Sequence, residues 1–458
     1  MAQIAGRQVE VGIGIETTAG TPVAATNYFK WDSFSMQAVA DKTMLQSARG
    51  IRNKVSNSLI TKKYGKGSIE FVPTTDMMPY ILGMVLGSRS SGASSGESAV
   101  YDHTFSVQNA NASMKTATLL VKQGGTQTER YANVVCDSFD LSVDKDLAKV
   151  KLGLLSAFPD TGSVSSSYTQ DTMFSRNQLS ATFGTSFSNA AGTYASTTLT
   201  SDATAPSDGD TVTIGSVVYT YKTTLTNSGN TPYEVLIGVS AAVALDNLQS
   251  AINGTSGAGT TYGYGTVAHP QVIATTNTAT TQLIKARVSG TGANTIATTE
   301  TSSHLSWAGA TMNSGTPGTG PAATPLVAFS LSINNNVLFD DAFLSGAATP
   351  VAGGFIAGPL EIKGSYTLQF TDVVELGKYQ ADTKNALIVT MTGGVAGVVP
   401  TMEQITFKLG KLILTKAPIE YNLDGITYLK QDFTVQHDAT DLAISAIVTN
   451  SYAGTNYQ

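Results

Sequence analysis

KGSIEF at residues 66–71 and, with two residues inserted, KGSYTLQF at residues 363–370 are two copies of one polar–apolar stretch. Polar and apolar side chains alternate along both copies, which is the pattern of a half-buried β-strand. A Thr-Asp pair follows each copy, beginning at Thr75 and at Thr371, and both residue types favour the start of a helix. The stretch therefore predicts a strand followed by a helix in two places.

Other matches repeat with nearly the same spacing. Gly67 and Gly364 lie 297 residues apart, and the other matching segments lie 294 to 296 residues apart. In the order first copy and second copy, these are 75–76 and 371–372, 34–36 and 329–331, 119–122 and 413–416, and 139–143 and 433–436. Because one spacing recurs, we interpret the chain as a duplication of one mainly β unit. The duplication is imperfect, since the strand pattern at 387–391 has only a Ser/Gly-rich counterpart near residue 92.

The composition indicates a β-rich and turn-rich protein. The chain has 458 residues, which predicts two to four domains, and only 13% of them are charged. A net charge of −6 argues against a free nucleic-acid-binding protein, which would carry a basic face. The single cysteine, Cys136, excludes an intramolecular disulfide framework and a Cys-based zinc site. The N-terminus has no apolar signal-peptide core, and the apolar run 77–86 is about half the length of a membrane span, so we expect a protein that starts in a cytoplasm.

We expect four segments along the chain. Residues 1–160 form the first β unit, with an N-terminal arm over 1–33 and a long basic loop over 42–66; residues 161–205 are a Ser/Thr-rich linker; residues 206–318 are an inserted α+β domain; residues 319–458 form the second β unit. The predicted class is mainly β, with one packed helix in each unit.

The inserted domain has local signals of its own. Gly215 and Ser216 join two alternating runs, at 211–214 and 217–221, into a predicted hairpin. Ser240 is a predicted N-cap, and Asn253-Gly254 is the predicted end of that helix. Further strands are expected at 271–275 and 282–288.

The N-terminal segment carries a family resemblance. A strand at residues 8–14 followed by ETTAGTP at 16–22 resembles the opening of many major tail proteins, the tail tube subunits of long-tailed bacteriophages. The resemblance continues through 66–71, 131–142 and 329–335, although Asn133 stands where glycine is expected. It implies two tandem β-sandwich or barrel units of the tail-tube type, and stacked rings that form a tube through which DNA passes.

This resemblance gives roles to particular residues. One face of the sheet would line the channel, and its candidates are Glu70, Asp140, Ser142, Asp144, Gln369, Thr434 and Gln436. Neutral or acidic side chains are expected there, because DNA must slide past without binding. The basic loop would reach the next ring, and its candidates are Arg49, Arg52, Lys54, Lys62 and Lys63.

The same resemblance implies partners and a location. The chain would assemble with itself, with a tape measure protein and with a tail terminator protein, and double-stranded DNA would pass transiently. Rings of the family contain six units, so two units per chain predict a homotrimer with approximate six-fold symmetry. The protein would be a virion tail component assembled in the bacterial cytoplasm, with no membrane and no cofactor.

Catalytic signals are weak. The histidines His103, His269, His304 and His437 stand apart in the sequence, and the Gly-x-Ser-x-Gly match at 92–96 lacks the strand and helix that a nucleophile needs. We therefore expect a protein that is not an enzyme. The alternative function is a surface-binding virion decoration or adhesin-like protein whose inserted domain binds a host glycan.

Overall fold

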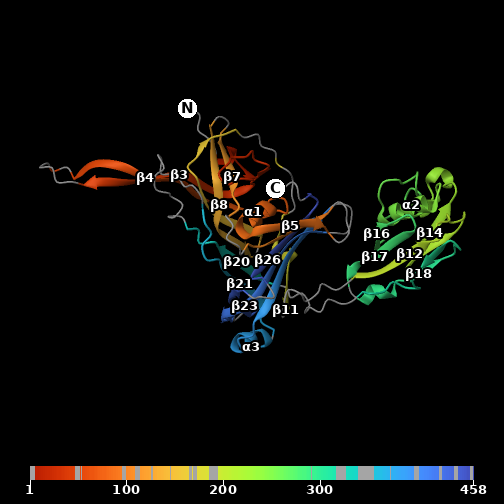
Figure 1. Ribbon diagram of the computed structural model, residues 1–458. Coiled ribbons are helices and arrows are strands. Elements are labelled where there is room, and N and C mark those ends of the chain that lie inside the picture. Colours follow the sequence, from red (N-terminus) through yellow and green to blue (C-terminus); the bar gives the residue numbers. More distant parts are fainter. Residues whose placement is uncertain are drawn as a thin grey trace. The chain divides into compact units, whose positions relative to one another are not determined.

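The computed structural model is mainly β, and its described residues form two compact units (Figure 1). It describes residues 6–46, 52, 54–94, 100–108, 114–124, 127–144, 146–163, 168, 173–184, 194–289, 291–315, 326–338, 355–371, 373–396, 402–421, 425–437, 442–453 and 457. Unit 1 lies within residues 1–94, 99–187 and 322–458, and unit 2 lies within residues 188–321.

Sheet I of unit 1 takes strands from both the N-terminal and the C-terminal part of the chain. Its order is β3 (Trp31–Gln46), β4 (Val55–Phe71), β9 (Lys149–Ser156), the second part of β8 (Gln127–Val143), β20 (Ala328–Asn334), β21 (Glu361–Gln369), β25 (Tyr428–Gln436) and the last part of β23 (Met402–Lys416). Each strand is antiparallel to its neighbours, and β24 (Ile419–Glu420) continues along β25 where β23 ends. Among the described strands, β3 lies at one end of the sheet, and β23 with β24 lies at the other.

Two further sheets complete unit 1. Sheet II has the order β11 (Leu179–Gly184), β22 (Asn385–Val395), the first part of β23, β26 (Ile444–Asn450), β6 (Tyr101–Val107) and β5 (Gly87–Ala93). Sheet III has the order β2 (Asn27–Tyr28), β1 (Val9–Ile15), β7 (Ala117–Gln123), the first part of β8 and β10 (Asp160–Thr161). The long strands β8 and β23 therefore each take part in two sheets.

The prediction that residues 1–33 form an N-terminal arm is wrong, because β1 is a strand of sheet III. A 3₁₀ turn, η1 (Gly6–Gln8), leads into β1, and all seven residues of β1 pair with β7. Val11 and Ile13 are fully buried, since their alternation places them against the core. The strand pattern at 8–14 was read correctly, but its edge is paired within the chain.

The predicted linker over 161–205 is corrected as well. The turn η2 (Arg176–Gln178) precedes β11, which pairs with β22 along six residues and buries Leu179, Ala181 and Phe183. Residues 194–201 form β12 (Tyr194–Ser201), an inner strand of unit 2. Ser and Thr fill most of the less buried alternate positions of β11 and β12, and in β12 Thr197 and Ser201 are buried as well.

The helices of unit 1 differ in burial. α1 (Met78–Leu86) has eight buried residues among nine, and Pro79 lies in its first turn. Thr74 Oγ1 accepts a hydrogen bond from Met77 N at 3.2 Å just before the helix, so the predicted Thr75-Asp76 cap is displaced. α3 (Val374–Gln380) is half-exposed or exposed at every residue whose side chain is described.

One hydrophobic core joins Phe71 and Phe139 to Phe329 and Phe433.

Unit 2 contains two four-stranded sheets and one α-helix in its described part. One sheet has the order β16 (Val272–Asn277), β17 (Thr281–Ser289), β12 and β19 (Leu305–Trp307). The other has the order β15 (Glu234–Leu236), β14 (Val217–Lys222), β13 (Thr211–Ile214) and β18 (Thr298–Glu300). The helix is α2 (Ala241–Asn253), and short 3₁₀ turns are η3 (Asn227–Gly229) and η4 (Thr291–Thr295).

The local predictions for this segment are confirmed. β13 and β14 form the expected hairpin, and Gly215 in its turn has a φ of +57°. Ser240 accepts a hydrogen bond from Val243 N at 3.3 Å at the start of α2, and Gly254 ends the helix in the left-handed conformation.

Candidate assembly surfaces of unit 1

A polar row crosses sheet I from strand to strand. Glu70 of β4 is the register partner of Lys151 of β9, and Lys151 is the partner of Asp140 of β8. The row continues from Asp140 through Ser332 of β20, Lys363 of β21 and Thr434 of β25. Register partners in neighbouring strands project to the same side, so these side chains share one face of the sheet.

All seven predicted channel-lining residues belong to this face. Glu70, Asp140 and Thr434 lie in the row itself; Ser142, Gln369 and Gln436 lie on the same strands at alternate positions; Asp144 continues the alternation beyond the end of β8. Asp140, Ser142, Asp144, Gln369 and Gln436 are exposed, and Glu70 and Thr434 are half-buried. The alternation of polar and apolar residues therefore grouped them correctly.

The face also carries lysines that the sequence analysis missed. Lys149 and Lys151 of β9 are exposed on it, and Lys149 Nζ lies 3.1 Å from Asp32 Oδ2 and 3.5 Å from Glu70 Oε1. Lys363 Nζ forms an ion pair with Glu361 Oε1 at 2.7 Å. The face that holds the seven candidates is therefore of mixed charge and not neutral or acidic, because basic and acidic side chains alternate on it. The signal was present in the Lys-Val-Lys-Leu pattern at 149–152.

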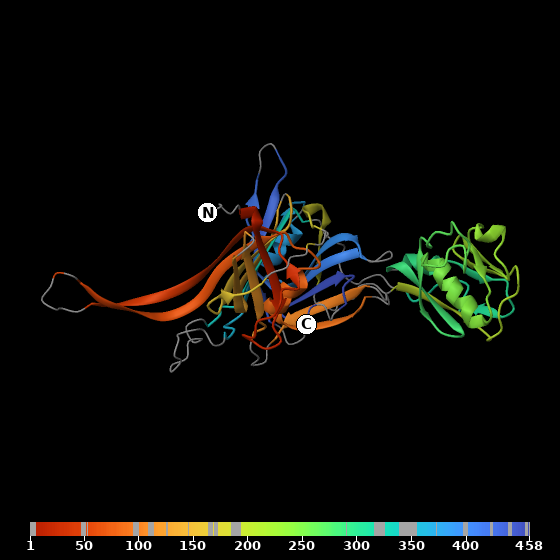
Figure 2. The same cartoon turned by 90° about the horizontal axis from the view of Figure 1, so that it is seen from above.

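The predicted basic loop over 42–66 is a hairpin and not a loop. β3 and β4 pair almost continuously from the sheet out to Gln46 and Val55 (Figure 2). Lys62 is the partner of Asp41, and Lys63 Nζ lies 5.3 Å from the centre of the Phe158 ring. Side chains alternate along both β3 and β4, so the two backbones can lie side by side and pair. The pairing satisfies N–H and C=O groups that a loop would leave to water. Among the other candidates, Arg52 and Lys54 are exposed, and Arg49 lies outside the described residues.

The far half of this hairpin exposes large apolar side chains. Met44, Leu45 and Leu59 are 58%, 59% and 72% exposed. Sequence reasoning followed only the charges and missed these residues. An apolar and basic ribbon of this kind is typical of a surface that another molecule covers.

The two repeated glycines have a common structural reason. A Cβ on Gly67 would lie 1.9 Å from the Ser35 carbonyl oxygen, and a Cβ on Gly364 would lie 2.3 Å from the Ser330 carbonyl oxygen. In both hairpins the backbone of the neighbouring strand occupies the space that a side chain would need. The twin stretch thus marks the same close strand contact in β3–β4 and in β20–β21.

A buried carboxylate explains two residues of the N-terminal resemblance. Glu16, which begins the ETTAGTP segment, accepts hydrogen bonds from Thr116 Oγ1 at 2.7 Å, Thr118 Oγ1 at 2.8 Å and Asn133 N at 2.9 Å. Asn133, which stands where glycine is expected, has a φ of +55°. Asparagine tolerates this left-handed conformation better than most residues. Glu16 therefore fixes the turn after β1 to sheet III.

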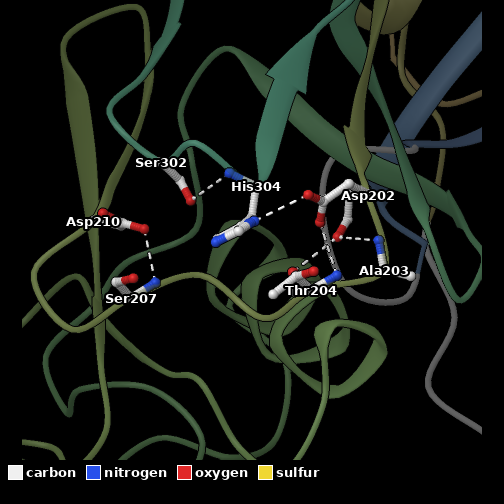
Figure 3. Close-up of polar contacts among 8 residues, drawn as sticks. Asp202, Ala203, Thr204, Ser207, Asp210, Ser302 and His304 are labelled. Carbon is white, nitrogen blue, oxygen red and sulfur yellow. Dashed lines mark hydrogen bonds and ion pairs between the residues drawn. The ribbon is translucent and has the colours of Figure 1, made fainter.

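Unit 2 contains a histidine–carboxylate pair, drawn in Figure 3. His304 Nδ1 lies 3.0 Å from Asp202 Oδ2, and Thr204 N donates to Asp202 Oδ1 at 2.8 Å. The hydrogen bond from His304 holds the pKa of Asp202 below its usual value. Asp202 N also donates to the His304 carbonyl oxygen at 3.2 Å, so the pair joins the loop after β12 to the loop before β19. This arrangement holds the two loops together.

In the part of the chain that the structure describes, no group of three or more His, Cys, Asp or Glu side chains is arranged to hold a metal ion. The same described residues contain no helix with the length and apolar character needed to cross a membrane.

Comparisons with known proteins give no family for this chain. No protein-family model matches it, and no curated protein sequence matches it.

Proposed function

We propose that this chain is a structural subunit of a phage tail tube, which assembles into stacked rings around a channel for DNA. The observation that carries the proposal is sheet I. In the described part of the chain it receives four strands from each half and ends at β3 on one side and at β23 with β24 on the other. Open edges pair readily with strands of another chain, and a closed ring of chains leaves none open.

The strand pairings support two copies of one unit. In the first copy, sheet I has the order β3–β4–β9–β8, and β8 continues into the series β10–β8–β7–β1. In the second copy, sheet I has the order β20–β21–β25–β23, and β23 continues into the series β26–β23–β22–β11. β8 and β23, the two strands that pass from one sheet into another, each carry a register shift. It lies between Cys136 and Ser138 in β8 and between Leu414 and Lys416 in β23. The strands β10, β8, β7 and β1 of the first series therefore correspond, in the same order, to β26, β23, β22 and β11 of the second.

This alignment differs from the one expected from sequence spacing. The pairings equate β8 with β23 and β7 with β22, whereas the spacing had matched 119–122 to 413–416 and 139–143 to 433–436. The strand at 387–391 then has β7 as its counterpart, and the hairpin β5–β6 is an addition to the first copy. The second copy begins at β11, so unit 2 interrupts it after its first strand.

Two copies per chain favour a ring of three chains with approximate six-fold symmetry. The mixed polar face of sheet I would line the channel. Its acidic residues repel the DNA backbone, and two of its lysines, Lys149 and Lys363, are paired with carboxylates, which limits DNA binding. The β3–β4 hairpin, with its exposed apolar and basic side chains, would contact the next ring, and tape measure and tail terminator proteins would contact the tube.

Imaging of the purified chain tests this function. We expect rings or tubes by electron microscopy, and a ring mass of three chains by native mass spectrometry. The matched variant replaces residues 194–315, the described part of unit 2, with a Gly/Ser linker. Its rings should keep their symmetry but lose the density of three copies of unit 2. Monomers at high concentration would contradict the proposal, and rings of six full chains would contradict the trimer alone.

A second candidate is a surface-binding virion protein in which unit 2 binds a host glycan. Tyr264 of unit 2 is 64% exposed, and an exposed aromatic ring is the usual platform for a sugar. Dispersed monomers that bind glycans, with binding lost in Tyr264→Ala, would favour this function.

A further inference from the structure

The junction between β8 and β20 is a complete strand pairing inside the chain. Six residue pairs join these strands, from Val143 with Phe329 to Ser138 with Asn334. Its inward-facing side chains are at most 2% exposed, and they are Phe139, Leu141, Val143, Phe329, Leu331 and Ile333. This junction shows how the last sheet I strand of the first copy receives the first strand of the second.

The equivalent strands at the ends of sheet I are β24 and β3. The register shift of β8 at Cys136–Ser138 corresponds to that of β23 at Leu414–Lys416, so residues 138–143 correspond to residues 416–421. β24 confirms this correspondence, because Ile419 pairs with Leu429 of β25 as Leu141 pairs with Val150 of β9. On the other side, the twin glycine contacts equate Ser35 with Ser330, so residues 34–39 correspond to residues 329–334.

We propose that residues 416–421 of one chain pair antiparallel with residues 34–39 of a second copy, in the register of the β8–β20 junction. This rests on the proposed ring assembly and specifies its contact. Transfer of the register places Met36 beside Ile419 and Phe34 beside Tyr421 on the inner face. On the polar face it places Ser35 beside Glu420.

The burial of these side chains supports the pairing. Tyr421 is 79% exposed, whereas its counterpart Val143 is 1% exposed. Ile419, Phe34 and Met36 are half-buried, and their counterparts are buried in the internal junction. Joining the two edges would cover this apolar surface, which is the main favourable contribution to strand association.

Pro418 is compatible with this pairing. Proline lacks an N–H group and often blocks a strand edge. Here the Pro418 carbonyl oxygen accepts a hydrogen bond from Lys430 N at 3.1 Å. Because the N–H and C=O of a residue in an antiparallel strand point to the same side, the missing N–H faces β25. The outer side is left to Ala417, Ile419 and Tyr421, which keep their N–H groups.

Each chain thus presents one edge of each kind, and the contact is head-to-tail. Such contacts form closed rings when the rotation between subunits closes. The β8–β20 junction supplies the geometry of that rotation within the chain.

Cross-linking between chains tests the register. Directly opposite residues have Cα atoms about 4.5–5.5 Å apart, within the range of a disulfide, and diagonal neighbours are about 7–8 Å apart. The test variant is Ser35→Cys with Glu420→Cys, and the control is Gln37→Cys with Glu420→Cys, which is two residues out of register. Cys136 will not compete, since it is fully buried and burial raises the pKa of its thiol.

Under mild oxidation we expect the test variant to form covalent oligomers at least about tenfold faster than the control. Equal or faster cross-linking of the control would overturn the register. Rings that form without cross-links in the test variant would also overturn it and leave the proposed function standing. Register-specific cross-links in open chains, with no rings, would support the pairing and contradict the ring.

Discussion

α1 and α3 follow β4 and β21, the two strands that carry the repeated stretch, yet they differ in burial. α1 is buried on eight of nine residues, whereas α3 is half-exposed or exposed wherever its side chains are described. The sequences agree with this difference, since α1 reads MPYILGMVL and α3 reads VELGKYQ. A helix that is apolar on all sides must be covered on all sides.

The hairpin β5–β6 provides the additional cover. α1 packs against β5, β6, β8 and β26, whereas α3 packs mainly against β23. Arg89 of β5 donates a hydrogen bond to the Tyr457 carbonyl oxygen, and Tyr457 packs edge-on against Tyr80 of α1 at 5.1 Å between ring centres. The comparison teaches that the composition of each helix agrees with how much of it the neighbouring elements cover.

The largest expected effect is loss of a core side chain from α1. Ile81 is fully buried, so Ile81→Ala should lower the free energy of unfolding of unit 1 by about 2–5 kcal/mol. Tyr379→Ala in α3 is the matched control; Tyr379 is 39% exposed, and its loss should cost less than about 1 kcal/mol. The chain has two tryptophans, Trp31 in unit 1 and Trp307 in unit 2, so Trp307→Phe makes fluorescence report unit 1 alone during urea unfolding. Equal losses in both helices would contradict the comparison.

An intermediate effect should depend on pH through the cover of α1. His103 of β6 is fully buried; Ser91 Oγ lies 2.8 Å from its Nδ1, and Asn450 Oδ1 and the Tyr452 carbonyl oxygen lie 3.0 Å from its Nε2. Burial lowers the pKa of His103 below its usual 6.5, and Arg89 lowers it slightly further. The hydrogen bonds to Asn450 and Tyr452 and the charge of Asp102 oppose this shift without cancelling it. The unfolded chain therefore binds more protons, and the stability of unit 1 should fall as the pH drops below about 6.5.

The check is a series of urea unfolding curves across that pH range, followed through Trp31. His103→Gln should remove part of the pH dependence. His269→Gln is the control, because His269 lies in unit 2, where burial also lowers its pKa. If His269→Gln changes the Trp31 signal as much as His103→Gln does, the assignment to the α1 cover fails.

The smallest effect is expected in α3. Lys378 Nζ pairs with Glu375 Oε1 at 2.5 Å, and both side chains are 25% exposed. Pairs of this spacing on a helix contribute about 0.2–0.5 kcal/mol, so Glu375→Gln should change the unfolding free energy of unit 1 by no more than about 0.5 kcal/mol. A loss above about 1.5 kcal/mol, measured in the Trp31-only background, would mean that α3 is as integral to the core as α1.

The candidate surfaces were partly predictable. The seven polar positions from Glu70 to Gln436 were placed on one face of the strands because the alternation of polar and apolar residues is a local property of each strand. Lys149 and Lys151 were missed because no strand was predicted at 149–156. The hairpin over 42–66 was read as a loop because its lysines obscured the alternation, while its pairing required both strands to be seen together.

What the sequence alone determined is therefore local: the alternation of its strands, the turn at Gly215, the cap at Ser240, and the two glycines that repeat. Only the tertiary structure decided which strands are neighbours. It placed β9 between β4 and β8, gave β8 and β23 each a place in two sheets, and left β3 and β24 at the ends of sheet I among the described strands. The physical reason is that any two amphipathic strands can pair through the same backbone groups, so partners are chosen by the burial of side chains far apart in the chain.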